Sequence, residues 1–492
     1  MIRRTLTSSL AIALCASTVV AQDLPQAQSD YFTAGQALIA ERVAAEPNTN
    51  TAKNVILFVA DGMGIGPNYG IRLFAGQQQG LLGEEYNLPH DLFPHSAIMK
   101  TYNINAQTPD SAPTAGAMNS GVKQVFNTIN LDDTAIYNEC STEVPLRLFS
   151  EIVADAGKSV GVVSTASVAH ATPAAVYAKT ANRNWFHDAP EGCDDIALQL
   201  VNQFEAGVID VALGGGIRDF APEGTALDNG TGRRLDGQNL LERLDGLGVQ
   251  YVHDAETLAA ADRSQPIIGL FANSDMNYQE DRPEGEPSLL DMTVTAIEQL
   301  QTNEDGFYLM VEAGRVDHAL HGGNAHRAFT DGVIFAEAIQ AALDMVDLEE
   351  TLVIVTADHE HVINFQGYCG RGTPITGLCM DIASGQVEHS GEPVLADDGL
   401  PYTVVTFGNG AGSILIEQED GTYSGARPAL TQEEVLDPDY LQQALIPMSS
   451  ESHSGVDVGL WATGPWAHLF GGTMDQEMIF HVMNHAAIAS AR

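Results

Sequence analysis

The segment Asn54–Ala60 constrains the fold more than any other part of this chain. It reads Asn-Val-Ile-Leu-Phe-Val-Ala, so six apolar residues follow one another without a polar interruption. Such a run is typical of a strand that is buried on both faces, as in a parallel sheet. Similar runs recur along the chain, at Val160–Thr165, Asp210–Leu213, Phe307–Val311 and Leu352–Ala357.

Stretches with helical periodicity separate these runs, at Val144–Ala156, Ser288–Leu300 and Ala325–Val346. Strands that alternate with helices predict an α/β fold, with a doubly wound, mostly parallel central sheet flanked by helices. The 492 residues are ample for a large core.

Composition divides the remainder of the chain. The predicted core occupies residues 53–362 and resumes at 441–492, where Asp475–Ala487 forms a closing helix. Residues 363–440 are rich in Gly, Pro and acidic residues and are predicted to be an insertion with one returning strand, Thr403–Phe407.

The N-terminal part consists of two predicted segments. Residues 1–21 have a basic start and an apolar run, Leu10–Ala21, which predicts a secretory signal peptide cleaved before Gln22. The run is too short to span a bilayer, so we expect a soluble protein exported to the periplasm or beyond, although a retained anchor is the alternative. Residues 22–52 are predicted to be a helical arm, with an amphipathic helix at Ser29–Ala45 that packs on a partner subunit or on its own chain.

Four cysteines remain after the signal peptide and allow three pairings. A short segment, residues 370–378, separates Cys369 from Cys379 and can curl back on itself, so we expect these two to pair and Cys140 to pair with Cys193. A zinc–thiolate cluster is the competing use, but the chain has no Cys-x-x-Cys spacing.

The formal net charge is −43, from 22 basic and 65 acidic residues. This balance excludes a nucleic-acid partner. Because the acidic residues are spread along the chain, they indicate adaptation to high salt, where ions screen their repulsion. The alternative is a secreted acidic protein that works in ordinary salt. An anionic substrate would need local positive charge, which bound metal ions supply.

Metal-type ligands follow three of the predicted strands. Asp61 follows the first, Glu312 follows Phe307–Val311, and Asp358-His359 follows Leu352–Ala357. In an open α/β sheet, ligands bind beyond the carboxyl ends of the strands. A single Asp-Gly after a strand is usually a turn, but three such ends in one sheet predict a site.

A second group of candidates lies further along the chain. Asp317 and His321 are four residues apart and share one face of a predicted helix, which suits zinc. His453 is a candidate third ligand, and His361 is expected to be structural or to support the ligands. We expect structural roles for His468, His481 and His485.

Two further residues could bind or attack a phosphate. Ser111 precedes small, helix-compatible residues, so it lies at a predicted helix N-terminus, where a phosphate is favoured. Such a serine is usually only a cap, and becomes a nucleophile if a metal lowers its pKa. Arg183 carries a guanidinium that can hold two phosphate oxygens, with a surface salt bridge as the alternative.

Taken in order, these motifs resemble the alkaline phosphatase family over nearly the whole chain after residue 53. The resemblance implies a homodimeric enzyme that hydrolyses small phosphate monoesters through a phosphoserine, with two zinc ions and one magnesium ion. No membrane partner is expected, because no segment of the chain has eighteen unbroken apolar residues. Carried over by position, the first zinc would be held by Asp317, His321 and His453, the second by Asp61, Ser111, Asp358 and His359, and the magnesium by Asp61, Thr172 and Glu312, while Arg183 grips the phosphate.

Other positions indicate the branch of the family. His170 and His318 are similar to the animal enzymes, in which both positions are histidine and adjoin the metal ligands. The surroundings of Cys140 and Cys193 also look like the animal-type disulfide. Ala272 follows Leu270-Phe271 where the animal enzymes have a glutamate, so we predict no calcium site. Residues 363–440 resemble the crown insertion near the dimer interface.

Three other functions remain as alternatives. A related metal-dependent phosphodiesterase would need a pocket for a second ester arm. An arylsulfatase would need an arginine in the motif that begins at Ser111, and the chain has Ala115 there. A secreted phosphate-binding protein without turnover could use Arg183 and a helix N-terminus but would have no need of Ser111 between two metals.

Overall fold

The computed structural model describes residues 24–491, so the predicted signal peptide lies outside the described residues. Residues 24–47 belong to a small first unit. It contains the short helix η1 (Pro25–Gln28) and the helix α1 (Asp30–Ala44), neither of which has a buried residue. The predicted helix at Ser29–Ala45 is therefore present.

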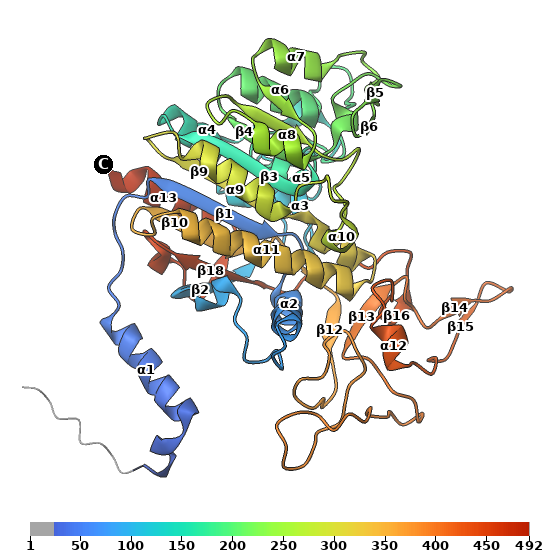
Figure 1. The fold of residues 1–492 in the computed structure, drawn as a ribbon. Helices are drawn as coiled ribbons and strands as arrows, with labels where there is room; N and C mark the ends of the chain where they lie inside the picture. The colour runs from blue at the N-terminus through green and yellow to red at the C-terminus, as the bar shows by residue number, and fades with distance from the viewer. Residues whose placement is uncertain (1–23, 492) are drawn as a thin grey trace, which may run out of the picture. The chain divides into compact units, whose positions relative to one another are not determined.

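The second unit, from Asn48 onward, is built on a ten-stranded sheet (Figure 1). In order across the sheet, its strands are β19 (Thr473–Asp475), β2 (His95–Lys100), β18 (Val458–Thr463), β10 (Thr351–Thr356), β1 (Asn54–Ala60), β9 (Phe307–Ala313), β3 (Ser159–Ser167), β4 (Val211–Gly215), β8 (Ile267–Leu270) and β7 (Gln250–Val252).

All neighbouring pairs from β10 to β7 are parallel, whereas β18 runs antiparallel to β10 and β2. Every residue of β1, β9 and β10 is buried, which is why apolar residues fill the middle of each strand. The predicted α/β class with a mostly parallel central sheet is confirmed, and β1 has the predicted bounds.

Helices cover both faces of this sheet, and Figure 1 shows α9 and α11 crossing its front. None of the described helices is long and apolar enough to cross a membrane. The helices of this unit are α2 (Ile65–Gln78), α3 (Ser111–Ser120), α4 (Phe149–Asp155), α5 (Ala171–Ala174), α6 (Ile196–Glu205), α7 (Leu240–Gly246), α8 (Ala255–Ala260), α9 (Leu289–Leu300), α10 (Gly314–His321), α11 (Ala325–Met345), α12 (Gln432–Val435) and α13 (Met478–Ala487).

Two helices begin later than predicted. The predicted helix Asp475–Ala487 begins at Met478 as α13, because Thr473–Asp475 pairs with β2 as the strand β19. The periodicity also predicted a helix from Val144, but α4 starts at Phe149. Pro145 instead forms an isolated bridge with Leu131, and the Leu146 N–H donates to the Asn130 carbonyl. The backbone before Leu148 therefore pairs with residues 130–131 in an extended conformation, which the local periodicity of the sequence does not predict.

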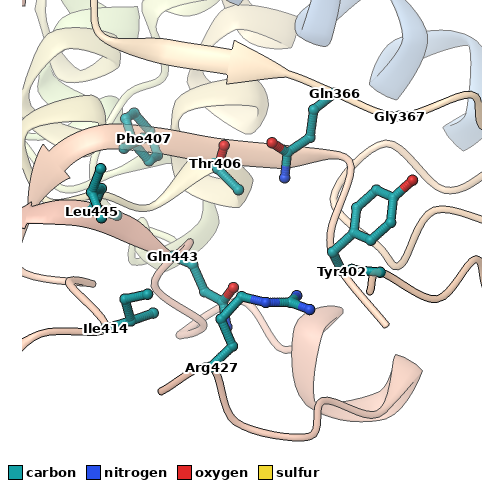
Figure 2. Close-up of a pocket in the computed structure, with 11 residues that line it drawn as sticks. Gln366, Gly367, Tyr402, Thr406, Phe407, Ile414, Arg427, Gln443 and Leu445 are labelled. Atoms are coloured by element: carbon teal, nitrogen blue, oxygen red, sulfur yellow. The ribbon is translucent and has the colours of Figure 1, made fainter. Parts of the chain in front are cut away.

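Within residues 363–440, the structure has strands β12 (Ile363–Phe365) and β13 (Val405–Gly410), which form a three-stranded sheet with β16 (Ala444–Pro447). A cavity of about 480 Å³ opens beside this sheet, between Tyr402, Phe407 and Arg427 (Figure 2). None of the predicted site residues lines it. The described chain also contains the short strands β5 (Ala226–Leu227), β6 (Gly230–Thr231), β11 (Glu360–His361), β14 (Ile416–Glu417), β15 (Tyr423–Ser424) and β17 (His453–Ser454).

Both predicted disulfides are present. Cys140 is bonded to Cys193, and Cys369 is bonded to Cys379. The second bond lies within the segment predicted to be an insertion, and Cys379 is fully buried.

Candidate metal centre

Three strand ends meet at the carboxyl edge of the sheet. Because β1 lies between β10 and β9, Asp61 after β1 is flanked by Asp358-His359 after β10 and by Glu312 near the end of β9. All four side chains are fully buried. The structure therefore brings together the ligands that sequence spacing predicted at this edge.

Ser111 is the first residue of α3 and faces this group. Its Oγ lies 3.1 Å from His359 Nε2 and 3.4 Å from Asp61 Oδ1. Asp61, Asp358 and His359 offer ligand atoms that all lie within 4.8 Å of one another. The Ser111 hydroxyl is thus next to a set of side chains that can hold a metal ion.

A second set consists of Asp317 and His321 on α10 and His453 on β17. The Nε2 atoms of both histidines lie 3.4 Å from Asp317 Oδ1. His321 Nδ1 is 2.6 Å from the Glu451 carbonyl, and His453 Nδ1 is 2.9 Å from the Pro109 carbonyl. Because a carbonyl only accepts, each Nδ1 carries a proton. The two Nε2 atoms lie 3.0 Å from each other and face Asp317, so both can be directed at one metal ion.

The same cluster contains His361, whose role was predicted to be structural or supporting. His361 Nε2 lies 2.8 Å from Asp317 Oδ1, and its Nδ1 lies 2.5 Å from Glu451 Oε2. Burial lowers the pKa of His361, but its two carboxylate partners outweigh burial and raise it to about 10. With both nitrogens protonated, His361 supports the orientation of Asp317 and has no lone pair for a metal.

Sequence reasoning did not find Glu451. Its side chain is buried, its Oε1 accepts from the Val362 N–H at 2.7 Å, and its carbonyl accepts from His321. It therefore connects the backbone around His321 with the imidazolium of His361. Its position two residues before His453 is the only signal that the sequence offers.

A third set adjoins the first. Asp61, Glu312 and His170 offer ligand atoms within 4.8 Å of one another, and Thr172, on α5, is fully buried. His170 was predicted to adjoin the metal ligands. In the structure it lies close enough to Asp61 and Glu312 to be a metal ligand itself. Burial raises the pKa of Glu312 to about 8.

The chemistry of these side chains fits metal ions. Burial, followed by the charges of Asp317, Asp358 and Glu312, raises the pKa of Asp61 well above its ordinary value. Among the described residues, the following buried oxygens have no hydrogen-bond partner: Asp61 Oδ2, Asp358 Oδ2, Glu312 Oε1 and Thr172 Oγ1. Buried carboxylates without partners are costly unless a cation neutralises them, and bound divalent ions would do so.

Arg183 lies beside this centre. Its guanidinium forms an ion pair with Asp110, the residue before Ser111, and its Nη2 lies 2.9 Å from His170 Nε2. Arg315 Nη1 lies 2.9 Å from His318 Nδ1, and the rings of His170 and His318 meet edge to face at 5.4 Å. Burial lowers the pKa of His170 to about 3, so its ring is neutral.

The three histidines predicted to be structural lie among aromatic residues. His468 and His485 both contact the ring of Trp466, and His481 packs on Phe480.

A parallel α/β sheet with carboxylate and imidazole ligand sets at its carboxyl edge defines the class of metal-binding α/β proteins. Residues 52–489 match the family model described as alkaline phosphatase. The tissue-nonspecific isozymes of alkaline phosphatase from Gallus gallus and Homo sapiens are 39% and 38% identical to this chain, and the alignments cover 89% and 90% of it and 85% of each relative. The chain belongs to the alkaline phosphatase family of metal-dependent phosphomonoester hydrolases.

Solved structures support the same fold. The alkaline phosphatase of Thermus thermophilus aligns with a TM-score of 0.63 at 23% identity and covers 89% of this chain and 92% of its own. That of a psychrophilic Shewanella species aligns with a TM-score of 0.62 at 22% identity, over 88% and 99%.

Proposed function

We propose that this protein hydrolyses small phosphate monoesters to an alcohol and inorganic phosphate, with Ser111 as the nucleophile, two zinc ions and one magnesium ion. The observation that carries the proposal is the position of the Ser111 Oγ, 3.1 Å from His359 Nε2 and 3.4 Å from Asp61 Oδ1, beside a second set of ligands.

The Nε2 atoms of His321 and His453, together with the buried carboxylate oxygens that lack partners, support an assignment of ligands to each metal ion. In this proposal, one zinc is held by Asp317, His321 and His453, and the other by Asp61, Asp358 and His359, with Ser111 joining once it is deprotonated. Asp61, Thr172 and Glu312 hold the magnesium. When bound, these ions lower the pKa of the Ser111 hydroxyl and stabilise the negative charge that develops on the ester oxygen.

The protein's own residues position the reaction. The Ser111 hydroxyl gives up its proton to solvent, and its Oγ attacks phosphorus and forms an O–P bond while the bond from phosphorus to the ester oxygen breaks. The ester oxygen takes a proton from water and leaves as the alcohol. A second water then attacks phosphorus, the Oγ–P bond breaks, and phosphate leaves as Ser111 regains a proton. Arg183, held by Asp110, donates to the non-bridging oxygens, and the N-terminus of α3 favours the phosphate at Ser111.

One feature supports a homodimer in this proposal. Around β14 and β16, Ile416 and Leu445 are 67% and 60% exposed. Contiguous exposed apolar patches mark interaction sites, whereas single exposed apolar residues are ordinary. The two disulfides support export to the periplasm or the extracellular space.

Metal analysis with chelation tests the function. We expect the purified protein to contain zinc and magnesium, to lose p-nitrophenyl phosphate turnover on chelation, and to regain it when zinc and magnesium are restored. Full turnover without zinc would contradict the proposal. Comparing monoester, diester and sulfate substrates separates it from a phosphodiesterase and an arylsulfatase, because a diester or sulfate rate above the monoester rate would favour those functions.

A further inference from the structure

The segment that carries Arg183 is anchored in a small hydrophobic cluster separate from the main core. Ala181 and Trp185, on either side of Arg183, are buried there with Leu131. Cys140 and Cys193 pack against this cluster and are bonded to each other. The disulfide is thus part of the anchor of the segment that presents the guanidinium.

Hydrogen bonds connect this segment to the residues around Cys140. The Asn138 N–H donates to the Ala181 carbonyl at 3.1 Å, and the Ala181 N–H donates to Glu143 Oε1 at 2.7 Å. The Asn182 side-chain amide lies 2.5 Å from Asn138 Oδ1. Displacement of residues 138–143 would therefore move the backbone next to Arg183.

Both segments joined by the disulfide are acidic, so their charges oppose close approach. Residues 132–143 contain four acidic residues, and residues 188–195 contain another four, of which Asp195 is paired with Arg234. Neither segment contains a lysine or an arginine. Burial, together with the charge of Asp194, raises the pKa of Glu143, so the two segments interact electrostatically. Within about 8 Å such repulsion persists at physiological ionic strength, whereas ~1 M salt screens it beyond about 3 Å.

We propose that the Cys140–Cys193 disulfide is a positioning element for phosphate binding, which holds two acidic segments together so that Arg183 stays beside Asp110. The inference rests on the proposed function, in which Arg183 binds the phosphate. It makes the disulfide most important in dilute buffer, where salt does not screen the repulsion.

The double variant Cys140→Ser/Cys193→Ser tests this inference. Phosphate binding to the metal-loaded protein is measured by calorimetry at 0.1 M and 1 M NaCl, together with kcat, KM and metal content. We expect the dissociation constant for phosphate and the KM to rise on the order of tenfold at the lower salt, with a smaller change at the higher salt. Metal content should stay that of the wild type, and Cys369→Ser/Cys379→Ser, which breaks the other disulfide, should leave phosphate affinity unchanged.

A charge rescue separates positioning from general loss of structure. In the disulfide-free protein, Glu191→Gln/Asp194→Asn should restore much of the phosphate affinity at 0.1 M NaCl. Trp185→Leu keeps the disulfide but shrinks the cluster. It should weaken phosphate binding to a similar extent at both salt concentrations, because the disulfide still opposes the repulsion, and it tests the anchoring of Arg183 if the serine variant does not fold.

Three outcomes would overturn the inference. If the disulfide-free protein binds phosphate with unchanged affinity and the wild type is active, the inference about the disulfide is overturned but the proposed function is not. An equal loss of affinity at both salt concentrations that the charge rescue does not restore would show only a folding role. A wild type that neither binds phosphate nor turns over monoesters would overturn the proposed function as well.

Discussion

The reactivity of the Ser111 hydroxyl depends on the residues beside it, Asp61 and His359. Ser111 is the first residue of a buried helix, α3, and its hydroxyl faces both of these side chains. A serine hydroxyl is a weak nucleophile until its proton is removed or its pKa is lowered. The surrounding ligand set therefore decides whether Ser111 reacts.

Ser111→Ala should lower kcat for p-nitrophenyl phosphate by at least about a thousandfold, because the attacking oxygen is lost. Zinc content and phosphate binding should be kept, since Asp61, Asp358, His359 and Arg183 remain. Kinetics with metal analysis checks both. Wild-type turnover in this variant would end the nucleophile assignment and favour a different reaction at the same centre.

Glu451→Gln should weaken zinc binding at Asp317, His321 and His453. Glu451 accepts from both His361 Nδ1 and the Val362 N–H, whereas Gln has a single acceptor oxygen and must lose one of these bonds, which weakens the support of Asp317 by His361. Changes to such supporting groups typically cost about 10- to 100-fold in metal affinity. Competition with a coloured chelator measures the loss. The exposed Glu433→Gln is the matched control, and equal affinity in both variants would contradict this role.

At the scale of elements, α11 carries a buried charge that the proposed reaction does not use. Asp331 is 2% exposed, and its Oδ2 accepts from the Gln279 N–H at 3.1 Å. Burial raises its pKa to about 7, although Arg315 and Arg327 act in the opposite direction. The unfolded chain then binds fewer protons than the folded one between pH 4 and 7, so this group lowers the free energy of unfolding as the pH rises through that range.

Asp331→Asn removes this cost. We expect the variant to melt about 2–4 °C higher than the wild type at pH 8, and the difference to vanish near pH 4, where the wild-type carboxyl is protonated. Thermal denaturation at both pH values measures it. The exposed Asp344→Asn, on the same helix, should show no such difference, and a wild-type melting temperature at pH 8 would contradict the argument.

For the whole molecule, the charge of −43 is the dominant property. The repulsion of 65 acidic residues is long-ranged in dilute buffer and is screened within about 3 Å at ~1 M salt. We therefore expect the melting temperature and the monoesterase activity to be higher in about 1–2 M NaCl than in dilute buffer, because salt at that concentration screens the repulsion. Titration with NaCl, against sucrose of equal osmolarity, decides this, and an optimum of both quantities in dilute buffer would remove the prediction of salt adaptation.

The class of the sheet and the residues at its carboxyl edge can be predicted from the residues alone. Continuous apolar runs identify strands because both faces of a central strand pack against apolar side chains, and β1 has the predicted bounds. Asp61 and Asp358 could be placed together because parallel strands end at the same edge. Where a segment pairs with a distant one, as Pro145 does with Leu131, local periodicity placed the start of a helix too early.

How side chains from distant segments meet depends on the folded chain and could not be predicted from local patterns. Glu451 reaches His361 because β11 pairs with β17, and Arg183 reaches Asp110 across 73 residues of sequence. Such contacts depend on pairing and packing between segments, which no local pattern encodes. The sequence therefore supplied the ligands, and the fold decided which atoms are free to bind a metal and which hold the others in place.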